Sequence, residues 1–172
     1  EAALKSNCFS QVIVSTDDDE ISEVAKKYGA NVPFVRPDEL SNDYVGTTPV
    51  IKHAIEWMED NNNSIENVCC LYATAPFIQS KIISKAYQKL KDKRANYCFS
   101  VTSFPFPIQR AILIREDNQI ELFQPEHYQS RSQDLDETHH DAGQFYWGTK
   151  QAFNCVNPLL SVVQSGVGSF FK

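Results

Sequence analysis

The sequence lacks an apolar run of the roughly 18 residues that a membrane-spanning helix needs, so we expect no membrane among its partners. No basic stripe stands out, and the formal net charge is −6. A negative protein repels a polymer of phosphates, although local groups can still hold a single nucleotide. We therefore expect a small-molecule ligand and no nucleic acid.

Cysteines at the Cys-x-x-Cys spacing of zinc sites are also absent. The five cysteines are odd in number, and three of them, Cys69, Cys70 and Cys98, lie in apolar runs. This pattern indicates buried free thiols rather than a disulfide framework. Free thiols are typical of a reducing compartment, so we expect the protein to be cytoplasmic.

The composition is that of a globular chain. Of the 172 residues, 42% are apolar and 12% aromatic, which predicts one domain over residues 1–172. A chain of this length buries roughly two-thirds of the surface that it exposes when unfolded, enough for one hydrophobic core. No internal repeat or low-complexity tract interrupts it.

Helical and strand patterns alternate in the first hundred residues. Apolar positions at helical spacing predict helices at 1–5, 17–28, 49–58 and 82–90. Short apolar runs predict strands at 11–16, 32–37, 68–72 and 97–102. Strands separated by helices indicate an α/β domain, with three layers and a mostly parallel sheet of Rossmann-like type.

The rhythm changes after Phe104. Alternating stretches at 110–115 and 119–123, divided by a turn at 116–118, predict a β-hairpin. A polar segment then leads to residues 143–148, a strand bracketed by glycines.

Ligands of open parallel sheets bind beyond the carboxyl ends of the strands. This rule directs attention to residues 15–17, 73–76 and 102–103, and to the surroundings of Tyr146. The first two are hydroxyl-rich turns whose N–H groups can approach a phosphate or a base. An ordinary capped strand-to-helix turn explains the same residues equally well.

Two features of the polar segment invite a functional interpretation. The guanidinium of Arg131 can hold a carboxylate through two parallel hydrogen bonds, although a surface ion pair is the commoner fate of a loop arginine. His139 and His140 precede Asp141, but adjacent residues on a strand point to opposite faces and do not easily share one ion. We therefore predict no metal ligand here.

Several segments, taken in order over residues 1 to 158, resemble the N-acylneuraminate cytidylyltransferases. The matching segments are 14–21 (VSTDDDEI), 26–30 (KKYGA), 36–37 (RP), 41–43 (SND), 73–76 (ATAP), Arg131 with 133–134 (QD), and 143–146 (GQFY). Residues 72–77 and 141–148 are most similar to the pseudaminic acid branch of that family.

The resemblance implies a nucleotide-diphospho-sugar-transferase fold and the synthesis of a CMP-nonulosonic acid, of the CMP-pseudaminic acid type, from CTP and the free sugar, with release of pyrophosphate. It also implies Mg²⁺ as cofactor of the complete enzyme and a homodimer formed through an arm at residues 104–140. The residues that we expect to bind the nucleotide are Ser15, Thr16, Asp17 and Thr47. Those that we expect to bind the sugar are Tyr72, Thr74, Arg131, Gln144 and Tyr146.

Some departures from the family limit these expectations. Tyr72 stands where sialic acid enzymes usually carry glutamine, which argues against sialic acid itself. The family's glycine- and lysine-rich phosphate loop and its Asp-x-Asp metal segment are not found in residues 1–172, and residues 161–172 resemble the family poorly. We therefore assign no catalytic or metal residue and expect these residues alone to be inactive. The alternatives are a cytidylyltransferase for legionaminic acid, sialic acid or Kdo, and a non-catalytic dimerising sugar-binding domain.

Overall fold

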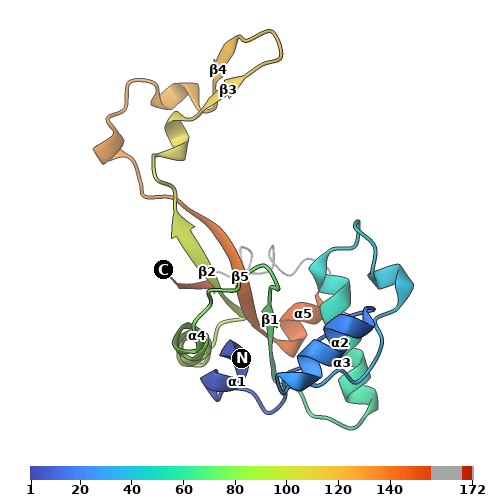
Figure 1. The fold of residues 1–172 in the computed structure, drawn as a ribbon. Coiled ribbons are helices and arrows are strands. Elements are labelled where there is room, and N and C mark those ends of the chain that lie inside the picture. The colour runs from blue at the N-terminus through green and yellow to red at the C-terminus, as the bar shows by residue number, and fades with distance from the viewer. Residues whose placement is uncertain (156–167, 172) are drawn as a thin grey trace. The chain divides into compact units, whose positions relative to one another are not determined.

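A computed structural model describes residues 1–155 and the backbone of residues 168–171 (Figure 1). The chain divides into two compact units. The core unit comprises Glu1–Phe99 and Gly143–Phe171, and the arm unit comprises Ser100–Ala142. Most of the poorly matching stretch 161–172 lies outside the described residues.

The core unit contains both helices and strands. Its helices are α1 (Ala2–Ser6), α2 (Asp19–Lys27), α3 (Thr47–Asp60), α4 (Ser80–Lys93) and α5 (Lys150–Asn154), with a 3-10 turn, η1 (Asp38–Leu40). The strands β1 (Asn67–Leu71), β2 (Tyr97–Ser103), β5 (His139–Thr149) and β6 (Gly168–Phe171) form one sheet in the order β1-β5-β2-β6. Among the described residues, no helix is long and apolar enough to cross a bilayer.

The predicted helices are confirmed, and their ends follow from local chemistry. Asp18 caps α2 by accepting a hydrogen bond from the Ile21 N–H at 2.8 Å. After α2, Gly29 adopts a φ of +86°, which glycine reaches without steric cost. Helix α3 begins at Thr47, two residues before Pro49, where a missing N–H is tolerated.

The sheet departs from the mostly parallel arrangement that we predicted. Strand β5 lies between β1 and β2 and runs antiparallel to β1, with Cys70 opposite Tyr146 and Asn67 opposite Thr149. The long β5 enters the middle of the sheet, so the parallel neighbours expected from the helix–strand alternation are separated. The parallel sheet is therefore not confirmed.

Two predicted strands are reduced to a single bridge. Residues 11–16 and 32–37 were expected as strands, but Ile13 and Asn31 form only an isolated parallel bridge. Its hydrogen bonds join the Val14 N–H to the Asn31 carbonyl at 2.9 Å and the Asn31 N–H to the Val12 carbonyl at 2.8 Å. Strand β1 is an edge strand of the described sheet, and residues 11–16 do not pair with it. The bridge between Ile13 and Asn31 therefore stays isolated from the sheet and does not extend into a pair of strands.

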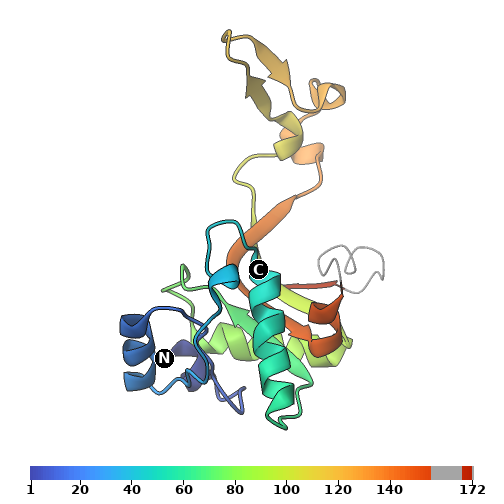
Figure 2. The same cartoon turned by 90° about the vertical axis from the view of Figure 1, so that its right-hand side faces the viewer.

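Helices cover both faces of the sheet in the core unit (Figures 1 and 2). On one face, α1 and α4 pack over Phe145 and Trp147. On the other face, α3 and α5 contribute Ile55 and Phe153 to a cluster with Tyr97. Alternate residues of β5 point to opposite faces, so one strand serves both clusters. The predicted three-layer α/β class is confirmed.

Close packing of aromatic rings stabilises each cluster. The Trp147 ring lies between Phe9 and Tyr87, at centroid distances of 4.9 and 4.5 Å, and its Nε1 donates to the Ile83 carbonyl at 3.1 Å. Gly148 follows on the other face, where a Cβ would approach the Tyr97 ring to 2.7 Å. Glycine is therefore required there for close packing.

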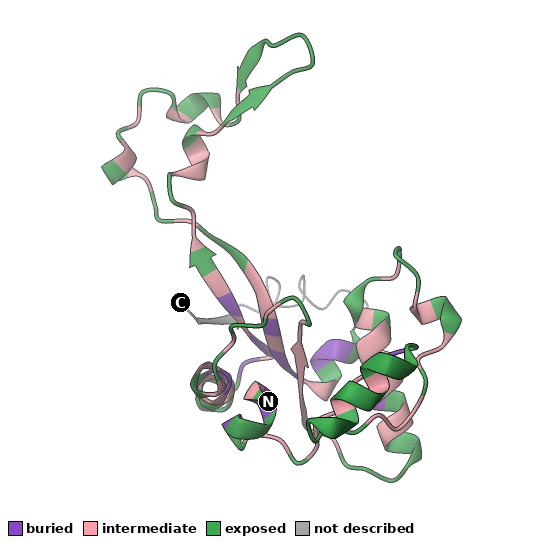
Figure 3. Cartoon of the chain, in the orientation of Figure 1, coloured by how far each residue is buried: buried purple, intermediate pink, exposed green. Residues whose placement is uncertain are grey.

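The arm unit contains the predicted hairpin. Its strands are β3 (Ile112–Ile114) and β4 (Ile120–Leu122), which pair antiparallel, and its 3-10 turns are η2 (Ile108–Arg110), η3 (Pro125–His127) and η4 (Ser132–Asp134). Between residues 101 and 142, no residue is buried (Figure 3).

Candidate functional site

The turn before α2 contains three of the predicted nucleotide-binding residues. Thr16 is buried, and its Oγ1 accepts a hydrogen bond from the Asp18 N–H at 3.1 Å. Its carbonyl accepts from the Arg36 N–H at 2.9 Å. The side chain of Thr16 thus stabilises the turn itself. This contact supports the interpretation of the segment as an ordinary capped strand-to-helix turn.

Arg36 determines how Asp17 is presented. Its Nη2 lies 2.7 Å from Asp17 Oδ1, and its Nε donates to Ser41 Oγ at 2.9 Å. The hydrogen bond from Arg36 holds the pKa of the Asp17 carboxyl below its usual range. Arg36 was not among the residues that we predicted for the site. The signal that could have identified it is its place in the segment 36–37, which resembles the family.

Ser15 differs from its two neighbours. Its hydroxyl oxygen is buried and has no hydrogen-bond partner among the described residues. A buried hydroxyl without a partner is costly, so a hydroxyl in this position is suited to a ligand. Ser15 is therefore the residue of this turn whose polar group is unused by the fold.

The second group of predicted residues converges from three elements. The hydroxyl of Thr47, at the start of α3, donates to the Tyr72 hydroxyl at 3.4 Å. The Tyr72 ring lies 5.6 Å from the Tyr146 ring of β5, which in turn stacks on Phe99 of β2 at 5.5 Å. The Tyr72 N–H donates to the Gln144 carbonyl at 3.0 Å. We call Thr47, Tyr72, Gln144 and Tyr146 the tyrosine site.

The tyrosine site combines residues that we predicted to bind different substrates. Thr47 was predicted at the nucleotide and the other three at the sugar, yet their contacts make one continuous surface. It combines two aromatic faces with hydroxyl groups, which suits a ligand that carries both apolar and polar substituents.

Thr74 lies in the loop after β1 and is exposed. The same loop presents Phe77, whose side chain is 91% exposed. The role of Thr74 stays a prediction, and among the described residues no hydrogen bond joins Thr74 to the tyrosine site.

Arg131 belongs to the arm unit, where it begins the turn η4. Its Nε lies 2.6 Å from Asp134 Oδ2, and its Nη2 donates to Asp134 Oδ1 at 3.1 Å. From the sequence we expected Arg131 to hold a ligand carboxylate through two parallel hydrogen bonds. In the structure the carboxylate of Asp134 makes this pair of bonds. Both groups are exposed, so the pair contributes little to stability and can be exchanged.

No metal centre is built by the described part of the chain, where no cluster of three His, Cys, Asp or Glu residues could hold an ion. His139 Nε2 lies 3.8 Å from Glu137, and His140 Nδ1 lies 2.8 Å from the Asp141 carbonyl. Each histidine therefore has its own separate neighbour.

The cysteines are free thiols. Cys98 is buried as predicted, whereas Cys69 and Cys70 are only partly buried as residues. Burial of the thiol raises the pKa of Cys70 to about 11 and raises that of Cys69 as well. Neither is a thiolate near neutral pH, so neither is a nucleophile.

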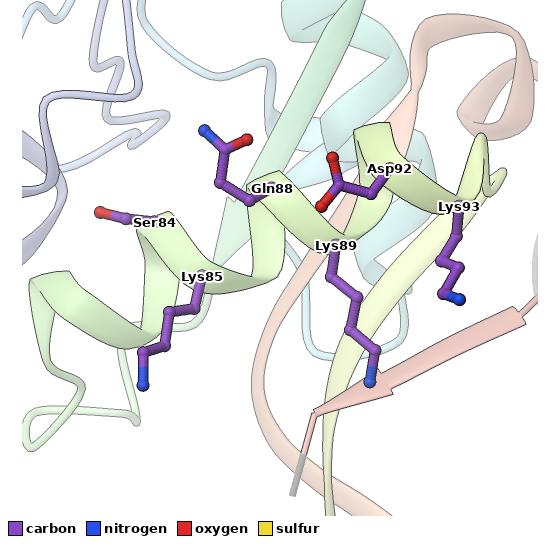
Figure 4. A pocket seen from close by; sticks show the side chains of 6 residues that line it. All are labelled: Ser84, Lys85, Gln88, Lys89, Asp92 and Lys93. Atoms are coloured by element: carbon purple, nitrogen blue, oxygen red, sulfur yellow. The ribbon is translucent and has the colours of Figure 1, made fainter.

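The pocket on the outer face of α4, lined by Ser84, Lys85, Gln88, Lys89, Asp92 and Lys93, contains none of the predicted site residues (Figure 4).

Comparison with known proteins gives a consistent result. The cytidylyltransferase family model matches residues 1–152. The chain is 48% identical over 153 residues to a pseudaminic acid cytidylyltransferase of Campylobacter jejuni, covering 89% of this chain and 66% of that protein. It is 33% identical over 162 residues to a Helicobacter pylori protein named pseudaminic acid cytidylyltransferase and UDP-2,4-diacetamido-2,4,6-trideoxy-beta-L-altropyranose hydrolase, covering 94% of this chain and 31% of that protein.

A solved structure has the same fold. It is the CMP:2-keto-3-deoxy-manno-octonic acid synthetase complexed with CTP, with a TM-score of 0.63, 15% identity, and coverage of 99% of this chain and 75% of that one. The chain spans slightly less than two-thirds of the length of the Campylobacter relative.

Proposed function

The chain belongs to the cytidylyltransferase family, and we propose from this premise that it forms the greater part of an enzyme that makes CMP-pseudaminic acid from CTP and the free sugar. The geometric observation that supports this proposal is the tyrosine site. There, Tyr72 stands in place of the glutamine of sialic acid enzymes and contacts both Thr47 and Tyr146.

The reaction joins the anomeric hydroxyl of the sugar to the α-phosphorus of CTP. A new oxygen–phosphorus bond forms, the bond to the bridging oxygen of the pyrophosphate breaks, and the hydroxyl proton is lost. Catalysis of such a transfer depends mainly on positioning and on electrostatic stabilisation. We propose that the Ser15 hydroxyl and Thr47 contact the nucleotide, and that Tyr72, Thr74, Gln144 and Tyr146 contact the sugar.

We propose that Arg131 holds the carboxylate of the sugar. A nonulosonic acid carries this carboxylate on the carbon that bears the reacting hydroxyl, so the group that holds it also orients the nucleophile. In the structure the fork of Arg131 already accommodates the carboxylate of Asp134. The substrate would take the place of Asp134 and keep the same pair of hydrogen bonds.

Mg²⁺ would neutralise charge on the phosphates during the transfer. The described residues do not fit such a site: Asp17 is paired with Arg36, and no set of three suitable ligands gathers in residues 1–155. We therefore assign no metal ligand and no step involving metal to this chain. The expectation of Mg²⁺ concerns the complete enzyme.

We also propose that the arm unit mediates a homodimer. One face of the hairpin carries Ile112 and Leu122 opposite each other, followed by Ile114 opposite Ile120. Ile114 and Ile120 are 70% and 67% exposed in the single chain. A two-stranded hairpin with an uncovered apolar face is only marginally stable, so a second copy is the natural cover. The free thiols support a cytoplasmic location for this dimer.

The test is an assay of pyrophosphate release with CTP and a panel of pseudaminic, legionaminic and sialic acids and Kdo. The complete enzyme should turn over pseudaminic acid with the highest kcat/KM. Residues 1–172 alone should give no measurable turnover, because their sequence lacks the phosphate loop and the Asp-x-Asp segment with which the family stabilises charge on the phosphates. A higher kcat/KM for another of these sugars would overturn the proposed substrate.

A further inference from the structure

Positive charge is concentrated on one helix of an acidic chain. Residues 80–94, which comprise α4 and the residue after it, hold six of the 16 basic residues and one of the 22 acidic residues of the whole sequence. The basic residues are Lys81, Lys85, Lys89, Lys91, Lys93 and Arg94. The remaining residues are therefore more negative than the net charge of −6 indicates.

Four of these lysines form a continuous row on the surface of α4. Lys81, Lys85, Lys89 and Lys93 are spaced four residues apart, which places them one above another on a helix. Figure 4 shows Lys85, Lys89 and Lys93 projecting to the same side of α4. We call these four residues the lysine row.

The stability of the helix does not account for the row. Like charges four residues apart destabilise a helix. Lys81 and Lys85 also lie in the N-terminal half, and Lys81, as the second residue, is close to the end where the helix dipole disfavours a cation. That dipole favours only the lysines of the last turn, Lys91 and Lys93.

Three of the four lysines in the row lack the ion-pair partners that other cations in the described part of the chain have. Elsewhere, ion pairs join Lys26 to Glu23, Arg36 to Asp17, Arg115 to Glu121 and Lys150 to Glu59. Within residues 1–155, Lys81, Lys85 and Lys93 form no ion pair. The fold thus leaves a row of positive charge that is uncompensated along most of its length.

We propose that the lysine row is the docking surface for an acidic segment of a partner protein. The row extends from Lys81 to Lys93, about 18 Å along the helix, which matches about five or six residues of extended chain. The adjoining hollow of about 410 Å³ is lined by three lysines of the row, Lys85, Lys89 and Lys93, together with Ser84, Gln88 and Asp92. The amide group of Gln88 can bind the main chain of the segment, while the lysines bind its carboxylates.

The remaining charge of the protein argues for a short acidic segment over other anionic partners. A net charge of −6 repels a nucleic acid or an anionic membrane that extends beyond the row, whereas a short peptide contacts the row alone. Described residues of α4 include no large exposed apolar side chain that could enter a bilayer. The row also contains no arginine, the side chain that best matches phosphate geometry.

The test measures binding of fluorescein-labelled octaglutamate to the 172-residue chain by fluorescence anisotropy. The peptide should bind saturably, with an affinity that falls as salt is added. The variant Lys81→Glu/Lys85→Glu should weaken binding by ~10-fold or more, because it reverses the charge of half the row. Lys27→Glu/Lys52→Glu makes the same change in net charge away from α4 and should alter binding by less than ~2-fold.

Equal losses in the two double variants would show a non-specific charge effect and overturn the proposal, as would the absence of saturable binding by the parent chain. Tighter binding of a single-stranded oligonucleotide, or of phosphatidylglycerol vesicles, would assign the row to a different partner and also overturn it. Circular dichroism melts of both variants show whether each remains folded, and a second pair with glutamine in place of glutamate removes charge without reversing it.

Discussion

The core unit and the arm unit are built on different principles. Every buried apolar residue of the described chain lies in the core unit, where helices cover both faces of the sheet. The arm unit exposes apolar side chains, including Phe106, Ile114, Ile120 and Phe123. Its few long-range hydrogen bonds include one from Arg110 to Ser132 at 3.1 Å.

The difference indicates that the stability of the fold depends on the core unit and much less on the arm unit. A unit with no buried apolar residue gains little from hydrophobic burial, so its structure depends on short hydrogen bonds and on whatever covers its apolar face. A change in the hydrophobic core should therefore affect folding, whereas a change in the arm should leave folding largely intact and act on the proposed association or on the proposed contact of Arg131 with the sugar. The predictions below test this division.

The largest effect is expected from Trp147→Ala. The substitution removes a ring that is 2% exposed, lies between Phe9 and Tyr87, and bonds to the Ile83 carbonyl. Loss of a buried tryptophan should lower the free energy of unfolding by about 3–5 kcal/mol. Urea denaturation followed by circular dichroism measures it, with Trp147→Phe as the variant that keeps ring packing. A loss below about 1 kcal/mol would mean that the core does not depend on this ring.

The packing of this core was largely predictable, whereas the order of its strands was not. The helical periodicity of residues 82–90 and the apolar run at 97–102 predicted α4 and β2, because burial on a covered sheet leaves a local pattern. The position of β5 between β1 and β2 depends on where the chain returns from the arm. No local pattern in the sequence encodes the position of β5, so the prediction that β1 and β2 are neighbours was wrong.

The candidate site could likewise be predicted only in part, because the sequence shows local segments but not the long-range contacts between them. Tyr72 and Tyr146 were identified by resemblance, and their ring contact follows from the antiparallel register of β1 and β5. The role of Arg36 was missed, because its partner Asp17 lies 19 residues earlier. The lysine row was also missed. Six basic residues lie within 80–94, but the sequence analysis did not identify them as a basic stripe, because lysines four residues apart share one face only on a helix.

The next largest effect is expected from Arg131 in the arm. In the complete enzyme, Arg131→Ala and Arg131→Lys should both lower kcat/KM for the sugar by roughly 10- to 150-fold, which corresponds to about 1.5–3 kcal/mol. Lysine cannot form the two parallel bonds that the structure shows between Arg131 and Asp134. The KM for CTP should change little. Steady-state kinetics with each substrate varied measures both quantities.

Asp134→Asn is the matched control for this prediction. It removes the carboxylate that occupies the fork but keeps a side chain of similar shape, so kcat/KM for the sugar should not fall as it does for the arginine variants. If all three variants fell alike, Asp134 would be needed to position Arg131, and its replacement by the substrate would be excluded. If Arg131 variants stayed within about twofold of the parent, the arginine would be an ordinary surface residue.

A smaller effect is expected at the apolar face of the hairpin. Ile114→Ser should weaken dimerisation by about 1–2 kcal/mol, or roughly 5- to 30-fold in the dimer dissociation constant, because an isoleucine would no longer be buried by the second copy. Leu113→Ser changes the opposite face, where Leu113 pairs with Glu121, and should have less effect. Sedimentation equilibrium measures both. A parent chain that remains monomeric at high concentration would remove the dimer proposal.

The smallest effect concerns the contact between Arg36 and Asp17, which makes the turn before α2 sensitive to pH. The Arg36 hydrogen bond depresses the pKa of Asp17 in the folded protein, below an unfolded value of roughly 3.9. A depressed carboxyl pKa stabilises the folded state above the unfolded value, and the contribution is lost as pH falls through the folded value. The contact should therefore be intact at neutral pH and weaken only in acid.

Because Asp17 is exposed, the change in stability should be small, and the direct measurement is an NMR titration of its carboxyl carbon. Arg36→Gln should return that pKa toward roughly 3.9, whereas Lys27→Gln, a loss of charge on α2 away from the contact, should leave it depressed. A titration of the parent at the unfolded value would show that Arg36 does not hold Asp17 in solution, and the turn before α2 would then lack the anchor that the structure gives it.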